Sequence, residues 1–385
     1  MDAVNPVDIQ ERTAPVRRKR RKKSGTVARV LRRFLLVVLT VVILAVSALC
    51  LVLNQVFNGP STAARDVLTM SLIEASATKW IPALFLGQAT VDEIRASVNV
   101  TMYEEKTDPS QVVIQKDDLS AQTDEWADYP DGIRIEEVYG DTYTAHVMII
   151  RDPSRVYLGI STQEGFSTSI LGKRLNEAIE DEGAIAAINA GAFNDDGTGS
   201  SYVGSVPQGL VYSRGLCVWN DGVTPNGIEG FAGFNEDDIL VVSQTNLTKA
   251  QAAELNIRDG CCFGPALIIN GETNLNAYND SSGYNPRTAI GQRADGAVIF
   301  VCIDGRQAGS LGGTYADIIN IMVEFGAVNA CNMDGGSSTV MMYRDTYGLY
   351  GDAGEVVMIN NYSLLRATPR RMPDYWMVSG TSEEE

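Results

Sequence analysis

Three apolar segments of the sequence each end in a hydrogen-bonding side chain that is followed by small residues. They are "AINAGAF" with Asn189, "VCIDGR" with Asp304 and "CNMDGGSS" with Asp334. Two carboxylates in one pocket suit the hydrolysis of an acetal, because one can protonate the leaving oxygen while the other assists attack at the sugar carbon. For either aspartate alone, Asp-Gly after a strand is the more usual sign of a turn. The recurrence at three strand ends favours a site.

The elements around these residues predict that the two aspartates meet. The stretch "TYADIINIMVEFG" has the apolar pattern of a helix, with Thr314 as its cap and Gly326 as its stop. If the flanking strands are parallel neighbours, a normal crossover places Asp304 and Asp334 at one edge of a sheet, where open sheets bind their ligands. Asp317 fits a capping box with Thr314 better than it fits a catalytic role.

The loop "DGGSST" has the composition of a cradle for an anion or a sugar. Gly335 and Gly336 let backbone N–H groups approach a ligand and adopt positive φ. Ser337, Ser338 and Thr339 add hydroxyl donors. No Gly-Lys-Ser/Thr follows, so this is not a Walker loop.

Other polar side chains have both a structural and a functional interpretation. Arg287, stiffened by the Asn-Pro before it, offers bidentate donors to a phosphate, and the alternative is a surface ion pair. His146 is the only histidine, and its apolar surroundings favour a core or edge position over a general base. Asp195 and Asp196 favour a turn over a weak cation site. The metal is left open: the oxygen-rich loops are compatible with Ca²⁺, but no EF-hand-like spacing appears and the sequence requires no cofactor.

The charge of the chain is unevenly distributed. The net charge is −17, yet residues 1–33 are rich in Arg and Lys, so the remainder is more acidic still. An acidic body would repel a phosphate backbone, which argues against nucleic-acid binding. The cluster "RRKRRKK" alone is typical of a nuclear or nucleic-acid patch, but beside an apolar run it is better explained as a membrane-topology signal.

The apolar run is Phe34–Leu53, 20 residues without a charge. A helix of that length crosses the roughly 30 Å hydrocarbon core of a bilayer. The positive-inside rule then predicts a cytoplasmic N-terminus and an extracellular C-terminal domain of a single-pass cell-membrane protein. A cleaved signal peptide is the alternative, disfavoured by the length of the run and by the lack of a small-x-small cleavage site in "NQVFNGP".

The cysteines predict neither a metal site nor a definite disulfide. One, Cys50, lies in the apolar run, and the other five are Cys217, Cys261, Cys262, Cys302 and Cys331. The absence of Cys-x-x-Cys and the single histidine argue against structural zinc. An extracellular body is compatible with one or two disulfides, whose pairing is left open together with the oligomeric state.

The order of segments predicts an α+β fold, with a mixed β-sheet body and a strand–helix–strand unit near the C-terminus. One transmembrane helix and a helical stem precede this body. In the stem, Ser61 or Thr62 is the expected cap of the first helix, and Pro82 is expected to break or kink it. The expected divisions are a basic cytoplasmic tail (1–33), the transmembrane helix (34–53), a helical stem and linker (54–130) and the main domain (131–385).

Taken together, these stretches resemble the phosphodiester glycosidase family. The matching motifs, in the family's order over roughly residues 135–380, are "AINAGAF", "GPALIINGE", "NPRTAIG", "VIFVCIDGR", "LGGTYADIINIM" and "ACNMDGGSSTVMMY". The anchor and stem also resemble bacterial members linked to exopolysaccharide biosynthesis. The resemblance implies an N-acetylglucosamine-1-phosphodiester α-N-acetylglucosaminidase-like hydrolase. Such an enzyme cleaves the bond between a sugar anomeric carbon and a phosphodiester, here on a cell-surface or exported glycan.

The resemblance also implies a set of site residues. Asp304, Asp334 and Asn189 would be catalytic, with the aspartates polarising the anomeric centre or activating water. The implied substrate-binding residues, several of which would hold the phosphate, are Arg287, Gly335, Gly336, Ser337, Ser338 and Gly191. Two departures leave the sugar open: the family's Asn-Gly-Gly-Phe is "NAGAF" here, and Asp317 stands where the family often has Glu.

Two other functions remain as alternatives. One is a non-catalytic glycan-binding or exopolysaccharide-assembly factor, and the other is a phosphodiesterase acting on a teichoic-acid-like polymer. The paired aspartates favour the glycosidase, because a pure binder would not place two carboxylates beside a phosphate.

Overall fold

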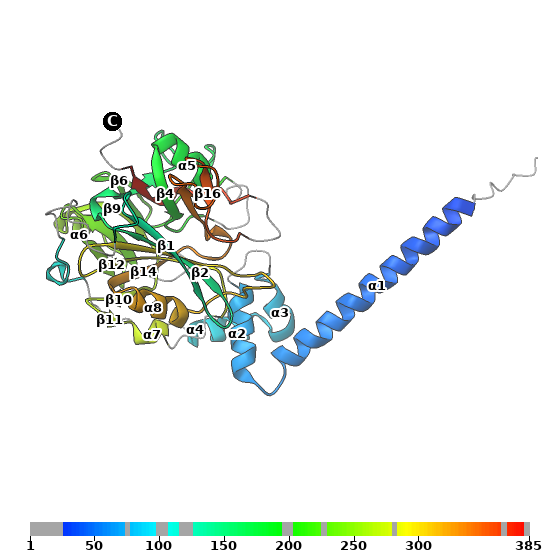
Figure 1. Cartoon of the computed structure of the whole chain (residues 1–385). Helices are drawn as coiled ribbons and strands as arrows, with labels where there is room; N and C mark the ends of the chain where they lie inside the picture. Colours follow the sequence, from blue (N-terminus) through cyan, green and yellow to red (C-terminus); the bar gives the residue numbers. More distant parts are fainter. Residues whose placement is uncertain are drawn as a thin grey trace, which may run out of the picture. The chain divides into compact units, whose positions relative to one another are not determined.

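The computed structural model describes residues 26–73, 78–97, 107–114, 126–194, 203–224, 229–278, 283–362 and 368–380 (Figure 1). The chain forms two compact units, Met1–Gln55 and Val56–Glu385. Most of the predicted basic tail, together with Asp195 and Asp196, lies outside the described residues.

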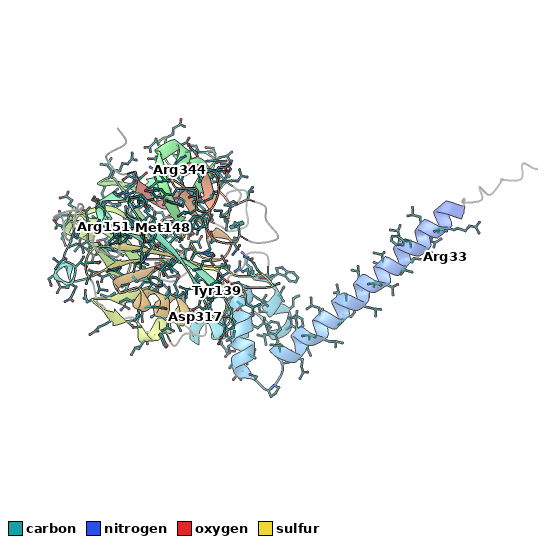
Figure 2. All side chains as sticks on the ribbon, in the orientation of Figure 1. Arg33, Tyr139, Met148, Arg151, Asp317 and Arg344 are labelled. Atoms are coloured by element: carbon teal, nitrogen blue, oxygen red, sulfur yellow. The ribbon has the colours of Figure 1, made fainter. Side chains whose placement is uncertain are left out.

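Helix α1, Thr26–Phe57, contains the predicted span. From Arg29 onward it is long and apolar enough to cross a membrane, the one such helix in the part of the chain that the structure describes. Its apolar side chains are exposed around the helix (Figure 2). A helix that is apolar all round needs a lipid or protein environment to cover it.

The helices of the second unit are short and carry the signals that the sequence predicts. Thr314 and Asp317 form a capping box at the start of α8, and Gly326 follows its end with φ +83°. Helix α5 begins at Leu175, and just before it Lys173 pairs with Met372 in an isolated bridge. The helices are α2 Thr62–Ile73, α3 Ile81–Leu86, α4 Gln88–Ser97, α5 Leu175–Glu182, α6 Lys249–Glu254, α7 Leu275–Tyr278 and α8 Tyr315–Glu324.

The largest sheet has seven strands in the order β1-β2-β13-β12-β14-β10-β11. Strands β12 and β13 form a hairpin around Asp295-Gly296. The strands of this sheet are β1 Ile133–Tyr139, β2 Thr144–Ile150, β10 Ala266–Ile269, β11 Glu272–Thr273, β12 Arg287–Arg293, β13 Val298–Ile303 and β14 Ala327–Met333.

Two five-stranded sheets complete the body, in the orders β16-β15-β4-β17-β3 and β6-β5-β9-β7-β8. All strand pairings in the described residues are antiparallel. The α+β class expected from the sequence is confirmed. The strands are β3 Val156–Ile160, β4 Ala184–Asn189, β5 Leu210–Ser213, β6 Leu216–Asn220, β7 Phe231–Asn235, β8 Leu240–Ser243, β9 Ile257–Cys262, β15 Met341–Arg344, β16 Val356–Met358 and β17 Asp374–Ser379.

The strand–helix–strand unit differs from the sequence expectation in one respect. Strands β13 and β14 are not neighbours, because β12 lies between them and is antiparallel to both. Two strands that are antiparallel to the same strand run parallel to each other, so β13 and β14 still end at the same edge. Residues 304 and 334 leave the sheet at that edge, as the sequence predicted.

The core lies between the sheets, and helices cover their outer faces. One buried cluster draws on all three sheets through residues such as Met148, Trp376 and Phe234. A second cluster packs α8 on the seven-stranded sheet, and a third packs α5 on β4 and β17. Figure 1 shows α5 and α8 on opposite sides of the body. Two helices thus cover two different sheets, and all three sheets share one core.

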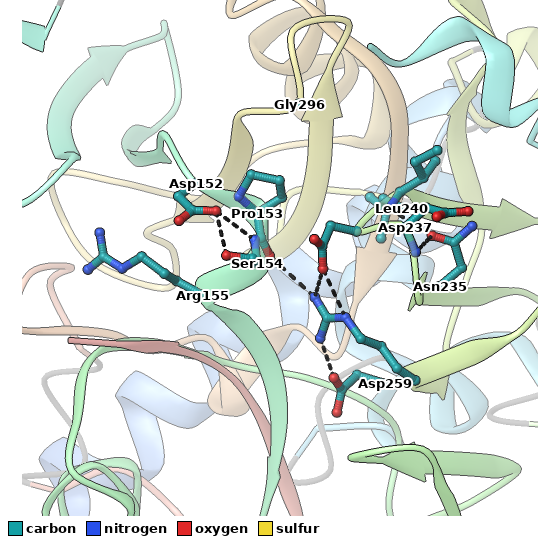
Figure 3. Close-up of polar contacts among 12 residues, drawn as sticks. Asp152, Pro153, Ser154, Arg155, Asn235, Asp237, Leu240, Asp259 and Gly296 are labelled. Carbon is teal, nitrogen blue, oxygen red and sulfur yellow. Dashed lines mark hydrogen bonds and ion pairs between the residues drawn. The ribbon is translucent and has the colours of Figure 1, made fainter. Parts of the chain in front are cut away.

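Arg258 joins the sheet β6-β5-β9-β7-β8 to the segment that precedes β3. Its guanidinium forms ion pairs with Asp238, at 3.1 Å, and with Asp259, and it donates to the carbonyl oxygen of Pro153 at 3.3 Å (Figure 3). Side-chain oxygen of Asp152 caps the short turn that carries Pro153. This contact set ties β9 to the segment before β3.

The stem and linker pack on the body rather than only spacing it from the anchor. Ser61 caps α2, as expected. Pro82 lies in the first turn of the separate helix α3, so it does not kink a longer helix. Farther on, Thr107 exchanges backbone and side-chain hydrogen bonds with Val242, and its hydroxyl also contacts Asn329 at 3.2 Å. The stem helices belong to the same compact unit as the sheets.

Candidate functional site

Asn189 is the last residue of β4 and joins the ends of several strands. Its Nδ2 donates to the carbonyl oxygen of Asp334 at 2.6 Å. Its Oδ1 accepts from the hydroxyl of Thr288 at 2.9 Å and from the N–H of Val340 at 3.2 Å. The side chain is fully buried. With both ends of the amide in use, Asn189 positions the loop that follows β14.

Asp304 is buried at the end of β13 and contacts the single histidine. Its Oδ2 lies 3.1 Å from Nε2 of His146, and Asn361 donates to the same carboxylate through its backbone and its side chain. The register of β2 and β13 puts His146 beside Cys302, so His146 and Asp304 point to the same face of the sheet. His146 is buried, as its apolar surroundings predicted, yet it is also the partner of a predicted site residue.

The other ring nitrogen of His146 has a looser environment. Nδ1 is buried without a hydrogen-bond partner in the described part of the chain. A carboxylate oxygen, Oε1 of Glu137, lies 3.8 Å from it. That distance is too long for a hydrogen bond. The ring is therefore held by the carboxylate of Asp304.

Asp334 is half-buried and lies next to a second acid that the sequence did not reveal. Its N–H donates to the carbonyl oxygen of Ala190 at 3.1 Å. The next residue, Gly191, donates its N–H to Oδ1 of Asp374 at 2.8 Å. Burial raises the pKa of Asp374, and the hydrogen bond from Gly191 partly lowers it. The charge of Asp334 raises this pKa further, to about 7.

Gly191 is required by close packing. A side chain there would place its Cβ 3.0 Å from the Cβ of Cys261 and 3.5 Å from Oδ1 of Asp374. A Cβ at 3.0 Å forces its neighbours to move. The predicted substrate-binding glycine thus lies inside the protein, packed against Cys261, and its N–H holds Asp374.

The loop after Asp334 is a tight turn, Gly336–Ser338. Gly336 has φ +62°, which favours glycine, and a Cβ on Gly335 would lie 2.8 Å from the carbonyl oxygen of Pro286. The N–H groups of Gly336 and Ser338 donate to backbone carbonyls, at 2.8 and 3.1 Å. The acceptors are Pro286 for Gly336 and Gly335 for Ser338, so both donors are already used and the geometry gives no support to their holding a phosphate.

Two arginines that the sequence reading did not single out flank this turn. A Cβ on Gly336 would lie 3.2 Å from Nη1 of Arg306, so that guanidinium sits directly over the turn. Nη1 of Arg370 donates to Oγ of Ser337 at 3.2 Å, and the same guanidinium lies over the ring of Phe193. Arg306 is exposed and Arg370 is half-buried. Both guanidinium groups therefore lie beside the turn on side chains that reach solvent.

Arg287 lies on the other face of the sheet. Thr288 points toward Asn189, so the neighbouring Arg287 points toward α8. Its guanidinium donates to the carbonyl oxygens of Gly313 and Gly283, both at 3.2 Å, and stacks on Tyr315 at 4.2 Å. The residue is 3% exposed. The geometry gives Arg287 a role in holding two loops, and its binding of phosphate stays a prediction.

The structure gathers most of the predicted residues around the turn and adds others. A segment after β16 links Asp304 to the turn, since Asn361 contacts Asp304 and the hydroxyl of Tyr362 donates to the carbonyl oxygen of Ser337 at 2.6 Å. Ser338 is 1% exposed, and its Oγ has no partner among the described residues. This segment carries no local signal in the sequence, because only the tertiary fold brings it to the site. Arg306 did carry one signal, its place two residues after Asp304.

The described residues contain no group of three or more His, Cys, Asp or Glu side chains that could hold a metal ion. The six cysteines, all within the described residues, are free. Burial raises the pKa of Cys262 to about 12 and holds the pKa of Cys261, Cys302 and Cys331 well above the ordinary value. Such thiols are poor nucleophiles and poor metal ligands.

Two comparisons show which known sequences this chain resembles. The family model described as phosphodiester glycosidase matches residues 182–379. The SPbeta prophage-derived uncharacterized protein YomE of Bacillus subtilis (strain 168) is 25% identical over 199 residues, which are 51% of this chain and 28% of that protein. The chain therefore spans well under half of the length of this curated relative.

Two solved structures match this chain at lower sequence identity than YomE does. The catalytic domain of zebrafish N-acetylglucosamine-1-phosphodiester alpha-N-acetylglucosaminidase, auto-inhibited by its pro-peptide, is 19% identical with a TM-score of 0.49, covering 64% of this chain and 82% of that one. A hypothetical protein from Synechocystis is 17% identical with a TM-score of 0.44, covering 64% of this chain and 61% of that one.

Proposed function

The chain belongs to the phosphodiester glycosidase family, and from this premise we propose that it hydrolyses the bond between a sugar anomeric carbon and a phosphodiester. The substrate is a glycan of the cell surface or an exported glycan. The observation that carries the proposal is the turn Gly336–Ser338, which has a carboxylate at its start and two guanidinium groups beside it. An anion and an acetal carbon require this combination of charges in one place.

The two arginines supply the phosphate site in this proposal. Arg306 and Arg370 approach the turn from different loops, and guanidinium groups bind phosphate oxygens in a bidentate manner. Their contacts with the turn support this role better than the contacts of Arg287, which lies on the opposite face of the sheet. The arginines also offset the repulsion between the phosphodiester and the nearby aspartates.

One carboxylate acts at the sugar carbon, and the other positions the site. Water attacks the anomeric carbon, the bond from that carbon to the phosphate oxygen breaks, and the phosphate leaves with the electron pair. Asp334, which is half-buried at the turn, accepts the proton of the attacking water. A phosphate is already a good leaving group, so a strong general acid is unnecessary. Asp304 with His146 and Asn361 orients the segment that carries Tyr362 onto the turn.

The apolar helix supports a membrane location. The basic residues before Phe34 favour a cytoplasmic N-terminus by the positive-inside rule, and the proposal has the sheets outside, where a surface glycan is accessible. A link to exopolysaccharide synthesis follows from this location and from the family resemblance, and it is part of the proposal.

The test is to incubate the purified full-length protein in detergent with a panel of sugar-1-phosphodiesters and to measure free sugar and free phosphomonoester. Release of the sugar in equimolar amount with a phosphomonoester is the expected result. Cleavage on the other side of the phosphorus, which yields a sugar-1-phosphate and an alcohol, would favour the phosphodiesterase. Binding of glycans with no turnover of any member of the panel would favour the glycan-binding factor.

A further inference from the structure

Asp374 is a buried carboxyl group of the site region that the proposed hydrolysis does not use. It is the first residue of β17 and is 1% exposed. Oδ1 accepts the N–H of Gly191, but Oδ2 is buried and has no hydrogen-bond partner among the described residues. An unpaired buried oxygen costs much more free energy on a carboxylate than on a neutral carboxylic acid. The geometry therefore favours a protonated Asp374.

The same loop holds both Asp374 and Asp334. The carbonyl oxygen of Ala190 accepts the N–H of Asp334, and the N–H of the next residue, Gly191, donates to Asp374. Two acids held by adjacent residues interact through a buried, poorly screened environment. Ionisation of Asp374 is consequently felt at Asp334.

The groups that face Asp374 give its negative charge little support. In the part of the chain that the structure describes, the side chains that interact with it electrostatically include Asp334, Cys261 and Cys262 of β9, and Tyr375, each of which is neutral or negative. The hydroxyl of Tyr375 donates to the carbonyl oxygen of Lys173 and so is turned away. Burial and the charge of Asp334 thus place the pKa of Asp374 near neutrality.

We propose that Asp374 is a positioning residue that acts through Asp334: when neutral it leaves the site able to bind an anionic phosphodiester, and when ionised it adds a negative charge that weakens this binding. The proposal rests on the proposed function and adds an upper pH limit to it. No covalent bond forms or breaks at Asp374, which only exchanges its proton with solvent.

The test is the pH dependence of hydrolysis by the full-length protein in detergent from pH 5.5 to 8.5. We expect kcat/KM of the wild type to fall about tenfold above neutral pH, mainly through KM, as a charge appears in a poorly screened site. In Asp374→Asn, which keeps the shape and the acceptor for Gly191, the decline should disappear. An Asp374→Asn profile that falls in parallel with the wild type would overturn the proposal.

A second variant moves the decline without removing the carboxyl group. Cys261 lies beside Gly191 and Asp374, so Cys261→Ser places a hydroxyl donor next to the acid. A donor favours the charged form and lowers the pKa of the acid. The decline should therefore shift to lower pH, and an unchanged position contradicts the proposal. This variant also serves if Asp374→Asn fails to fold.

Binding of dimethyl phosphate separates this proposal from the hydrolysis itself. The probe keeps one negative charge across the pH range, so any pH dependence belongs to the protein. We expect its Kd, measured by calorimetry, to rise above neutral pH in the wild type and to stay constant in Asp374→Asn. This result without turnover of any sugar-1-phosphodiester would retain the role of Asp374 and reject the proposed reaction. Absent binding, or binding with the same pH dependence in both proteins, would reject the role of Asp374.

Discussion

At the scale of single residues, the site separates side chains that the sequence treats alike. Asp295, Asp304 and Asp334 all precede a glycine. Asp295 is an exposed turn residue, Asp304 is buried against His146, and Asp334 is half-buried at the turn. The same dipeptide thus serves as a hairpin turn once and as part of the candidate site twice.

The three aspartates provide a matched test of the carboxylates. Asp334→Asn should lower kcat for sugar release by about 100-fold or more, because it removes the proton acceptor. Asp304→Asn should also lower activity, since its new NH₂ group faces the donors of Asn361. Asp295→Asn is the control and should be active within about twofold. Wild-type activity of Asp334→Asn would show that the site is elsewhere in the protein.

The arginines at the turn should affect binding more than turnover. Arg306→Ala and Arg370→Ala are each expected to raise KM by about tenfold or more with a smaller change in kcat, because charge-assisted hydrogen bonds to phosphate are lost. Arg214→Ala is a suitable control: like Arg306, Arg214 is exposed and has positive φ, but it lies at the β5–β6 turn. Equal effects of the Arg214 and Arg306 variants would contradict a phosphate site.

The pKa of Asp374 predicts a stability effect that can be measured without a substrate. The folded protein binds this proton more tightly than the unfolded chain does, so the group lowers the free energy of unfolding as pH rises from 3.8 to about 7. At about 1.4 kcal/mol per pH unit, Asp374→Asn should gain up to about 4 kcal/mol relative to the wild type across that interval. Denaturant unfolding at pH 4.5 and pH 7.5 measures this gain. A constant difference at both pH values would contradict a raised pKa.

At the scale of elements, the site depends on how strand ends are held together. Asn189 joins β4 to the loops after β14 and before β15, and Arg287 clamps the loops at Gly283 and Gly313 from the far side of the sheet. Such contacts fix the positions of the turn and of α8 without touching a ligand. The short helices contribute little by themselves and serve mainly to cover the sheets.

Substitution of Arg287 separates a structural role of this side chain from a role in binding phosphate. Arg287→Ala should lower the free energy of unfolding by about 2–4 kcal/mol, because two buried carbonyls and the stacking on Tyr315 lose their cation. Urea unfolding together with KM provides the measurement. An unchanged stability with a raised KM would instead support the sequence-based expectation that Arg287 holds phosphate.

At the scale of the whole molecule, the chain combines a membrane-type helix with a body that includes the stem. The linker runs along the sheets, with Thr107 on Val242 and the N–H of Val113 on the carbonyl of Ala294. Gly283, whose carbonyl accepts from Arg287, is packed against Ser71 of α2. The stem is thus in contact with a loop that the arginine clamp holds.

Truncation should reveal these different contributions. A chain that lacks residues 1–55 should leave the membrane fraction and keep the melting temperature of the body, because the removed part belongs to the other compact unit. A chain that lacks residues 1–130 should melt several degrees lower, since about 1–3 kcal/mol of hydrogen bonding and packing is lost. Membrane flotation and thermal unfolding measure the two effects. Equal melting temperatures would show that the stem is only a spacer.

The sequence by itself determined the apolar helix, the α+β class, the caps of α8 and the aspartates at two strand ends. These features are local: they follow from apolar periodicity, glycine positions and capping residues. Tertiary structure decided that β12 lies between β13 and β14, that Arg287 faces α8, and that Asp374 contacts Gly191. Contacts between residues far apart in the chain depend on which sheets pack together, and neither periodicity nor spacing encodes that.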